Sequence, residues 1–339
     1  MDPFKRRKLG TSNVMLPQLG FGGAPLGELF VKVPETDSIA TMAAAWDGGI
    51  RYYDTAPWYG RGLSEHRIGQ GVYDKPRDEY QISTKVGRVL HAPIPPAWRP
   101  TDWAGGLPFA LRFDYSYDAV MRSFEDSLQR LRLTRIDVLV IHDLDFMYHR
   151  TDPLVNAYLT QLATGGYRAL AELKAAGLVG AIGAGINETG MIPRFLDLVD
   201  LDFFLVAMRY TLGEQSALET EMPRAAEKGI GFIIGGVFSS GLYATGPIKG
   251  AKFNYQDATP EELDRARKIE AVCRRHGVPL ATAALQFPLH HPQVASVIPG
   301  GFKPDQVSAN IKAMQQAIPD ALWAELKDEK LIRADAPTP

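Results

Sequence analysis

Four side chains of the sequence have the types needed to move a proton to or from a substrate. Asp54 and Tyr59 lie in the segment DTAPWYG, Lys85 lies in QISTKV and His142 lies in DVLVIHD. A tyrosine with a pKa of about 10 exchanges protons poorly at neutral pH, but a nearby ammonium favours the phenolate and lowers that pKa. A carboxylate can hold the ammonium in place, and a histidine can hydrogen-bond and orient a substrate carbonyl. The four residues together predict acid–base catalysis at such a carbonyl.

Each of these residues also has an ordinary structural explanation. An aspartate at a strand end can cap a turn, an isolated lysine usually extends to water, and a buried histidine is often a core residue with satisfied hydrogen bonds. The prediction of catalysis therefore depends on the four residues together, and on a fold that brings their strand ends to one place.

The elements that would position these residues alternate along the chain. Short runs of apolar or β-branched residues predict eight strands, and some of them, such as DVLVIH and GFIIGG, are almost continuously apolar, as expected for parallel strands buried on both faces. The predicted strands are Gln18–Gly22, Arg51–Thr55, Gln81–Val86, Asp137–His142, Ala181–Ile186, Phe203–Ala207, Gly231–Gly236 and Ala295–Pro299.

Segments of helical period lie between the predicted strands. They are Thr36–Trp46, Ser64–Gln70, Tyr117–Leu131, Gly166–Ala176, Gly190–Val199, Ser216–Lys228 and Thr259–His276. Thr36 and Thr259 are expected to cap their helices. Strand-then-helix units without a break in composition predict an α/β fold, a single (β/α)₈ TIM barrel domain over residues 1–339, rather than two doubly wound halves.

Two connections, Gly87–Ser116 and Asp143–Thr164, are too long to be ordinary strand-to-helix loops. Both follow carboxyl ends of predicted strands, where barrels build their active sites, so we expect them to form lids. The basic run Lys5–Lys8 is expected to be the solvated face of an N-terminal hairpin, although an anionic partner is the alternative.

The composition argues against several classes of protein. The chain has 339 residues with 37 Lys+Arg, 39 Asp+Glu and a net charge of −2, which gives no electrostatic reason to expect a nucleic-acid partner. The lone Cys273 cannot form an internal disulfide. No apolar run reaches the roughly 20 residues of a membrane span, and no signal-type segment is present. A cytoplasmic protein with no membrane partner is expected, and the sequence does not predict its oligomeric state.

At this point the sequence resembles a known family. Asp54 and Tyr59 in DTAPWYGRGLSE, Lys85 in STKVG and His142 in VLVIHD are similar, in order and at the expected strand ends, to the Asp–Tyr–Lys–His tetrad of the aldo-keto reductases. The resemblance covers nearly the whole chain. It implies hydride transfer between a nicotinamide cofactor and a carbonyl or alcohol carbon, with Tyr59 as general acid or base, Lys85 and Asp54 tuning it and His142 orienting the substrate oxygen.

The resemblance also implies a cofactor site. The glycines of GFGGAPLGE lack an acidic ribose partner at the spacing of a Rossmann motif. Aldo-keto reductases instead bind the dinucleotide across the barrel mouth, and GGVFSSGLYATG and VIPGGFKPDQVSAN are similar to their cofactor segments. The implied contacts are Gly23, Asp54, Asn187 (to the nicotinamide carboxamide), Phe238, Ser239, Ser240, Gly241, Ile298, Gly300, Gly301, Lys303, Gln306 and Asn310.

Two positions distinguish between the nicotinamide cofactors. Family members that use NADP usually have a basic residue directly after the proline of this segment and an arginine several residues later, where this sequence has Gly300 and Gln306. A 2′-phosphate needs cationic partners, and Lys303 is the only cation nearby. NAD is therefore the expected cofactor, with NADP as the alternative.

Within the family, four segments resemble the branch of D-threo-aldose (L-fucose) dehydrogenases and pyridoxal 4-dehydrogenases. They are TAPWYGRGLSE, STKVGRVL, HDLD and GGVFSSGLYATG. This resemblance implies oxidation of a small-molecule hemiacetal, from either a sugar or pyridoxal, with NAD. Trp58, Trp98, Trp103 and Asp143 are the candidate substrate contacts; the lid tryptophans could equally pack their loop onto the barrel.

Three alternatives remain open from the sequence. A ketone reductase or alcohol dehydrogenase for a bulkier metabolite would use the same groups. A catalytically idle interaction subunit, of the kind that accompanies channels, would not need Tyr59 and Lys85 together. A metal-dependent hydrolase would need carboxylates beside histidines, and His290–His291 has none at suitable spacing, so no metal site is expected.

Overall fold

The computed structural model of the chain describes residues 1–96, 99 and 102–339. Trp98, a candidate substrate contact, lies outside the described residues. Within the described part of the chain, no helix combines the length and the apolar character that crossing a membrane requires.

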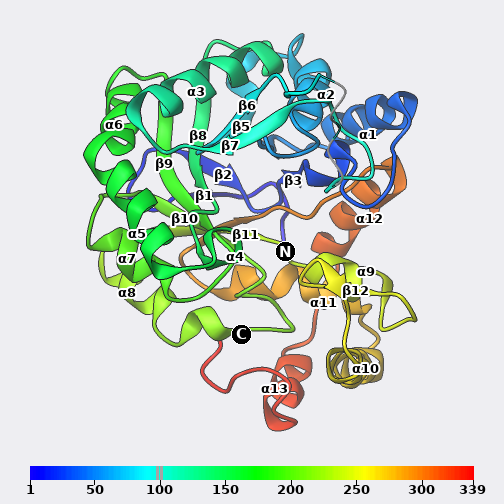
Figure 1. Ribbon diagram of the computed structural model, residues 1–339. Coiled ribbons are helices and arrows are strands. Elements are labelled where there is room, and N and C mark those ends of the chain that lie inside the picture. Colours follow the sequence, from blue (N-terminus) through cyan, green and yellow to red (C-terminus); the bar gives the residue numbers. More distant parts are fainter. Residues whose placement is uncertain (97–98, 100–101) are drawn as a thin grey trace.

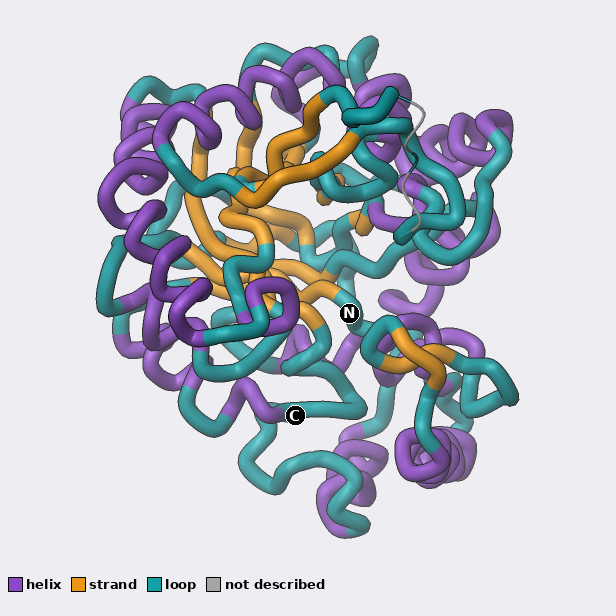
Figure 2. The backbone as a smooth tube through the Cα atoms, viewed as in Figure 1, coloured by secondary structure: helices purple, strands orange, loops and turns teal. Residues whose placement is uncertain are grey.

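Eight parallel strands form the centre of the molecule and confirm the predicted barrel (Figure 2). Their order in the sheet follows the sequence, and the two edges meet through parallel bridges that pair Leu19 with Val297 and Gly22 with Gly300. The backbone N–H of Gly20 donates to Val297 O at 2.9 Å across this seam. The strands are β3 (Phe21–Gly22), β4 (Tyr52–Asp54), β5 (Gln81–Val86), β8 (Ile136–His142), β9 (Val179–Ile186), β10 (Phe203–Ala207), β11 (Gly231–Gly235) and β14 (Val294–Val297).

Helices surround the strands, as Figure 1 shows. Those that match predicted segments are α1 (Glu35–Asp47), α2 (Leu63–Val72), α3 (Tyr117–Leu131), α6 (Tyr167–Ala175), α7 (Met191–Leu196), α8 (Glu221–Glu227) and α10 (Pro260–Arg275). α12 (Pro304–Gln315) follows β14 and has a proline at its first position. Further helices that the sequence patterns did not indicate are α4 (Phe146–His149), α5 (Asp152–Gln161), α9 (Leu242–Thr245), α11 (Leu280–Gln286) and α13 (Asp320–Asp328).

The two predicted threonine caps have different outcomes. At α10 the prediction is confirmed, because Thr259 Oγ1 accepts from Glu262 N and the Glu262 carboxylate accepts from Thr259 N at 2.8 Å. At α1 it is wrong. The N-cap is Pro34, and Thr36 lies inside the first turn, because the helix begins directly after the extended proline.

The N-terminal hairpin, β1 (Arg6–Lys8) with β2 (Met15–Pro17), is present as expected. Its Leu9 and Leu16 are fully buried and join the cluster inside the barrel, together with Tyr52 and Val140. Arg7 donates to Leu289 O and Val294 O, both at 2.9 Å. The hairpin therefore closes the amino end of the barrel, and only part of the basic run faces solvent.

Both long connections contain regular structure at the carboxyl end of the barrel. The first forms an antiparallel hairpin of β6 (Arg88–His91) and β7 (Ala110–Phe113), and the second contains α4 and α5. A third hairpin, β12 (Lys252–Phe253) with β13 (Gln256–Asp257), follows β11. These insertions place side chains from distant parts of the sequence around the ends of the strands.

Candidate active site

A buried ion pair joins the ends of β4 and β5. Lys85 Nζ lies 2.8 Å from Asp54 Oδ2 and donates to Thr55 O at 2.8 Å, and both charged side chains are only 2% exposed. Parallel pairing sets Asp54 opposite Ser83, whose hydroxyl donates to Asp54 Oδ1 at 2.7 Å. Because both charges are paired and hydrogen-bonded, the pair can persist out of water.

Tyr59 lies in the loop after β4, with Lys85 Nζ 4.5 Å from the centre of its ring. Burial raises the pKa of Tyr59 well above its ordinary value, and the Asp54 and Asp143 carboxylates add to that rise, whereas Arg88 opposes it. The sequence leads to the expectation that the Lys85 ammonium lowers the pKa of Tyr59. The net direction in the structure is the opposite, because Asp54 neutralises the ammonium and desolvation penalises the phenolate.

His142 ends β8 and faces the same site, with its ring edge-on to Tyr59 at a centroid distance of 5.9 Å. Its Nε2 lies 3.2 Å from Asp143 Oδ2, and among the described residues its buried Nδ1 has no hydrogen-bond partner. Burial, with help from Arg88 and Lys85, holds the pKa of His142 well below its ordinary value. The imidazole is therefore neutral at physiological pH and has one N–H to donate.

Asp143 follows directly and connects three neighbours. Its backbone is left-handed, with φ 46°, a conformation that non-glycine residues adopt at a cost. Its Oδ2 accepts from Arg88 Nη2 at 2.5 Å, and its Oδ1 accepts from Asn187 Nδ2 at 2.8 Å. Burial raises the pKa of Asp143 to about 6, although Arg88 acts in the opposite direction.

Arg88 is the residue of this site that sequence reasoning missed. It is the first residue of β6, it is 1% exposed, and its guanidinium carbon lies 4.0 Å from the centre of the Tyr148 ring. The available signal was an arginine among apolar residues in GRVL, directly after the strand that carries Lys85. A charge in such a setting is usually paired.

Trp103, in the first lid, is packed onto the site. Trp103 is 6% exposed, meets Trp58 edge to face at 5.6 Å, and lies 6.1 Å from the Tyr59 ring. The Trp58 ring also packs against the guanidinium groups of Arg61 and Arg88, at 4.8 and 4.6 Å. Trp103 thus both fastens the lid and forms a wall beside the tyrosine.

Two of the segments expected to bind the cofactor have polar side-chain atoms without a protein partner among the described residues. Asn187, after β9, donates from Nδ2 to Asp143 and Asp145, which leaves its Oδ1 without a donor among the described residues. After β11, positive φ angles at Ser239, Ser240 and Gly241 form a tight turn. Ser239 Oγ is buried there with no partner in the described part of the chain, while Ser240 Oγ accepts from Tyr255 N at 2.9 Å.

The remaining cofactor candidates lie around the seam of the barrel. Gly23 donates to Asp54 O at 2.8 Å, and a Cβ there would clash with Asp54 O and Ser64 Oγ at 2.7 Å, so close packing already requires this glycine. At Gly300, likewise, a Cβ would lie only 2.7 Å from Pro25 Cγ, so a larger residue would clash there. Ile298 is buried inside the barrel, whereas Gly301, Phe238 and Asn310 lie in the surrounding segments without a polar side-chain contact that assigns them a role.

Gln306 and Lys303 stand at the start of α12. The side-chain oxygen of Gln306 accepts from Phe302 N at 2.9 Å, so this side chain closes its own loop. Lys303 is exposed beside the Phe302 ring, and Asp305 follows it in the first turn.

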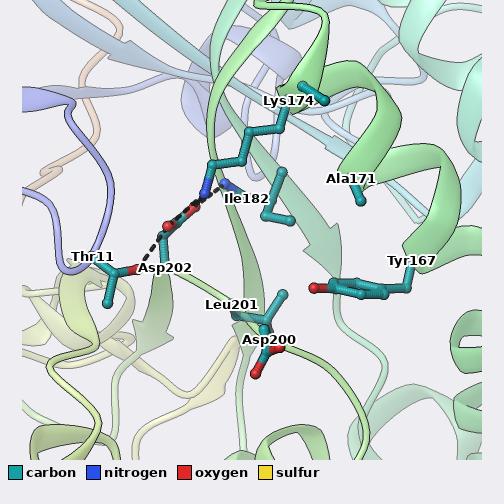
Figure 3. A pocket seen from close by; sticks show the side chains of 9 residues that line it. Thr11, Tyr167, Ala171, Lys174, Ile182, Asp200, Leu201 and Asp202 are labelled. Carbon is teal, nitrogen blue, oxygen red and sulfur yellow. Dashed lines mark hydrogen bonds and ion pairs between the residues drawn. The ribbon is translucent and has the colours of Figure 1, made fainter.

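A hollow of about 520 Å³ lies away from these groups, beside the amino end of β10 (Figure 3). Two of its charged side chains form an ion pair, with Lys174 Nζ 2.6 Å from Asp202 Oδ2, and Thr11 Oγ1 donates to Asp202 Oδ1 at 2.7 Å. These bonds fasten the N-terminal hairpin to the barrel. Among the described residues, no group of three or more histidine, cysteine, aspartate or glutamate side chains is arranged to hold a metal ion.

Comparison with known proteins agrees with this geometry. Residues 18–330 match the model of the aldo/keto reductase family. The chain is 42% identical to pyridoxal 4-dehydrogenase of Microbacterium luteolum, over 97% of this chain and 98% of that protein. It is 40% identical to D-threo-aldose 1-dehydrogenase of a Pseudomonas species, over 97% of each. The structure of aldo-keto reductase AKR11C1 from Bacillus halodurans superposes with a TM-score of 0.73 at 25% identity, over 98% of each chain. A barrel with these groups at its strand ends, and with these relatives over its full length, belongs to the aldo/keto reductase family and is an NAD(P)-dependent oxidoreductase.

Proposed function

We propose that the protein is an NAD-dependent dehydrogenase that oxidises the hemiacetal carbon of a neutral aldose to a lactone. The observation that carries this proposal is the cluster at the strand ends, where Tyr59 lies over the Asp54–Lys85 pair and beside neutral His142 and Asp143. Such a cluster supplies proton transfer to the reacting oxygen and a carboxylate for a neighbouring hydroxyl. The similarity to D-threo-aldose 1-dehydrogenase supports the same substrate class.

In this mechanism the anomeric hydroxyl lies between Tyr59 and His142. The bound nicotinamide supplies the hydride acceptor. The neutral imidazole donates to the substrate oxygen and fixes its orientation, while the Tyr59 phenolate takes the hydroxyl proton. Because burial raises the pKa of Tyr59, that phenolate is scarce at neutral pH, and oxidation is expected to become faster as the pH rises.

The lids have a further part in the proposed reaction. Trp103 of the first lid packs against Tyr59, and Trp58 packs against Trp103. An apolar cover excludes water from the reacting carbon and strengthens the electrostatic interactions inside the site. We therefore assign Trp103 to the wall of the substrate site and Asp143 to a substrate hydroxyl.

The residues fit a nicotinamide dinucleotide. Asn187 Oδ1 is left free to accept from a carboxamide, and the buried Ser239 hydroxyl, orphaned among the described residues, lies in a tight turn suited to a pyrophosphate. A 2′-phosphate would find the Gln306 side chain engaged with its own loop, and Asp305 beside the exposed Lys303. This arrangement supports NAD over NADP.

A second candidate substrate is pyridoxal in its hemiacetal form. The aromatic wall of Trp58 and Trp103 beside Tyr59 suits a pyridine ring as well as a sugar face. The relative of 42% identity is a pyridoxal 4-dehydrogenase. Both substrates require the same step at the hemiacetal carbon.

The experiment is to measure the initial rate of NADH formation by the purified protein with L-fucose, D-arabinose, pyridoxal and several secondary alcohols, with NADP⁺ in parallel. A preference for one aldose with NAD⁺ is expected. Preference for pyridoxal would select the second candidate, and activity on alcohols alone would overturn the assignment to hemiacetals. Tyr59→Phe, which retains the ring, is the matched control and is expected to lose turnover while still binding NAD⁺.

A further inference from the structure

We infer that Arg88 is a substrate-binding residue that selects neutral, hydroxylated substrates; this inference rests on the proposed function. The starting observation is that the Arg88 guanidinium is incompletely satisfied. Its Nη2 donates to Asp143 Oδ2, but its Nε and Nη1 are buried and have no hydrogen-bond partner among the described residues. A buried N–H without an acceptor costs free energy, and a ligand oxygen would remove that cost.

The position of the guanidinium shows where such an oxygen would lie. The Asp143 oxygen that accepts from Arg88 is also the oxygen that faces His142 Nε2 at 3.2 Å. The guanidinium and the imidazole of His142, which we propose orients the reacting group, are therefore separated by a single oxygen atom of Asp143. A substrate whose reacting hydroxyl is held by Tyr59 and His142 would bring its next oxygens to Asp143 and Arg88.

The aromatic neighbours of Arg88 fix its orientation. Its guanidinium carbon lies 4.0 Å from the ring centre of Tyr148, 4.6 Å from that of Trp58 and 5.1 Å from that of Phe113. A planar guanidinium packed between rings can turn little, so its free N–H groups are preorganised. Preorganised donors lose little entropy when they bind an acceptor.

The charge balance of the site selects the class of substrate. Three buried carboxylates (Asp54, Asp143 and Asp145) stand against two buried cations (Lys85 and Arg88). Arg88 keeps its charge, because Asp143 and Tyr148 outweigh the effect of burial and its pKa lies above the ordinary value. With no positive charge in excess, the cluster suits the hydroxyl or ring oxygen of a neutral molecule better than a phosphate or carboxylate.

The test compares Arg88→Lys with the wild-type enzyme on L-fucose or D-arabinose, whichever the wild type oxidises, and on monodeoxy forms of that sugar. If the wild-type enzyme oxidises only pyridoxal, the two substrates to compare are pyridoxal and 3-deoxypyridoxal. Lysine keeps the positive charge beside Asp143 but lacks the additional guanidinium N–H donors that would bind the substrate oxygen. We expect kcat/KM to fall about 10- to 100-fold on the full substrate. The penalty should disappear for the analogue that lacks the contacted hydroxyl, and NAD⁺ affinity should stay within about twofold.

The alternatives give different results. A purely structural Arg88 predicts the same penalty for every analogue, and either that result or no penalty at all would overturn the inference. Arg61→Lys, which also alters a guanidinium packed on Trp58, is the control for lid packing. Its change in kcat/KM should be the same for the full substrate and for every analogue. D-arabinose 5-phosphate should be oxidised at least about 100-fold less efficiently than D-arabinose; equal efficiency would contradict neutral selection. A wild-type enzyme that oxidises no hemiacetal would instead refute the proposed function.

Discussion

Arg88 and His142 share one oxygen atom of Asp143. Arg88 Nη2 lies 2.5 Å and His142 Nε2 lies 3.2 Å from the same Oδ2, although Arg88 begins a lid hairpin and His142 ends a barrel strand. The other carboxylate oxygen accepts from Asn187, a candidate cofactor contact. One buried carboxylate thus connects the lid, the histidine proposed to orient the substrate and the proposed nicotinamide site.

The first prediction is a loss of activity at low pH that arises from Asp143. Burial raises the pKa of Asp143 to about 6, so below that pH the carboxyl is protonated and its ion pair with Arg88 is lost. Below pH 6 we expect kcat/KM for a hydroxylated substrate to fall by up to about a further tenfold per pH unit, in addition to the slope that Tyr59 sets. Asp143→Asn should be less active, keep the rise with pH that the Tyr59 phenolate imposes, and lose the additional fall below pH 6. An additional fall that persists in this variant would assign that titration to another group.

Protonation of Asp143 does not unfold the protein, so unfolding through this group does not explain the loss of activity at low pH. A carboxyl whose folded pKa lies above its unfolded value binds its proton more tightly in the folded state. Its contribution to the free energy of unfolding is therefore largest below about pH 4 and declines as the pH rises to about 6. Urea denaturation at pH 5 and pH 7 should show no loss of stability from this group at pH 5.

The second prediction concerns the pH dependence of oxidation in Lys85→Met. Removing the ammonium leaves Asp54 unpaired, and this carboxylate already raises the pKa of Tyr59. The rising limb of the pH–rate profile should therefore move upward by about 1–3 pH units. The double variant Asp54→Asn with Lys85→Met has no unpaired charge at this place. The rising limb of its pH–rate profile should therefore lie closer to that of the wild type. An unmoved profile in the single variant would contradict the assigned role of Lys85.

The barrel and its catalytic ends could be predicted because their signals are local. A parallel strand buried on both faces must be apolar throughout, so a charged residue within or directly after such a run stands out. Lys85 and His142 are polar residues of this kind. The register that pairs Asp54 with Ser83 places Asp54 near Lys85, and the pairing of β5 with β8 sets Lys85 opposite Val140, two residues before His142. The helices α11 and α13 were missed because each begins directly after a proline, with no side-chain cap to mark its start.

The role of Arg88 could not be predicted, because it depends on contacts across the fold. Arg88 and Asp143 are 55 residues apart in sequence and meet only when the first lid folds over the end of β8. The pKa of Tyr59 depends in the same way on burial beneath Trp103, which no local pattern encodes. Desolvation is a property of the assembled site.

The third prediction concerns stability. Ser83 Oγ donates to Asp54 Oδ1 at 2.7 Å and lies 2.9 Å from the Tyr52 hydroxyl, and all three side chains are buried. Ser83→Ala should lower the free energy of unfolding by about 1–3 kcal/mol, since it leaves buried polar groups unpaired. Urea denaturation measures this, with Ser308→Ala at an exposed position of α12 as the control, expected to change stability by less than about 0.5 kcal/mol. Equal effects of the two substitutions would contradict the buried network.

The last prediction concerns the choice of cofactor. Gln306→Arg places a guanidinium where a 2′-phosphate would need one, so kcat/KM with NADP⁺ should rise at least about tenfold relative to NAD⁺. The same change removes the bond from Phe302 N to the Gln306 side chain, so affinity for both cofactors should fall slightly. Gln306→Met removes that bond without adding charge and separates the two effects, because it should weaken both cofactors without changing their ratio. If the arginine variant leaves the ratio unchanged as well, the start of α12 does not contact the adenosine ribose, and the basis for NAD preference must lie elsewhere in the mouth of the barrel.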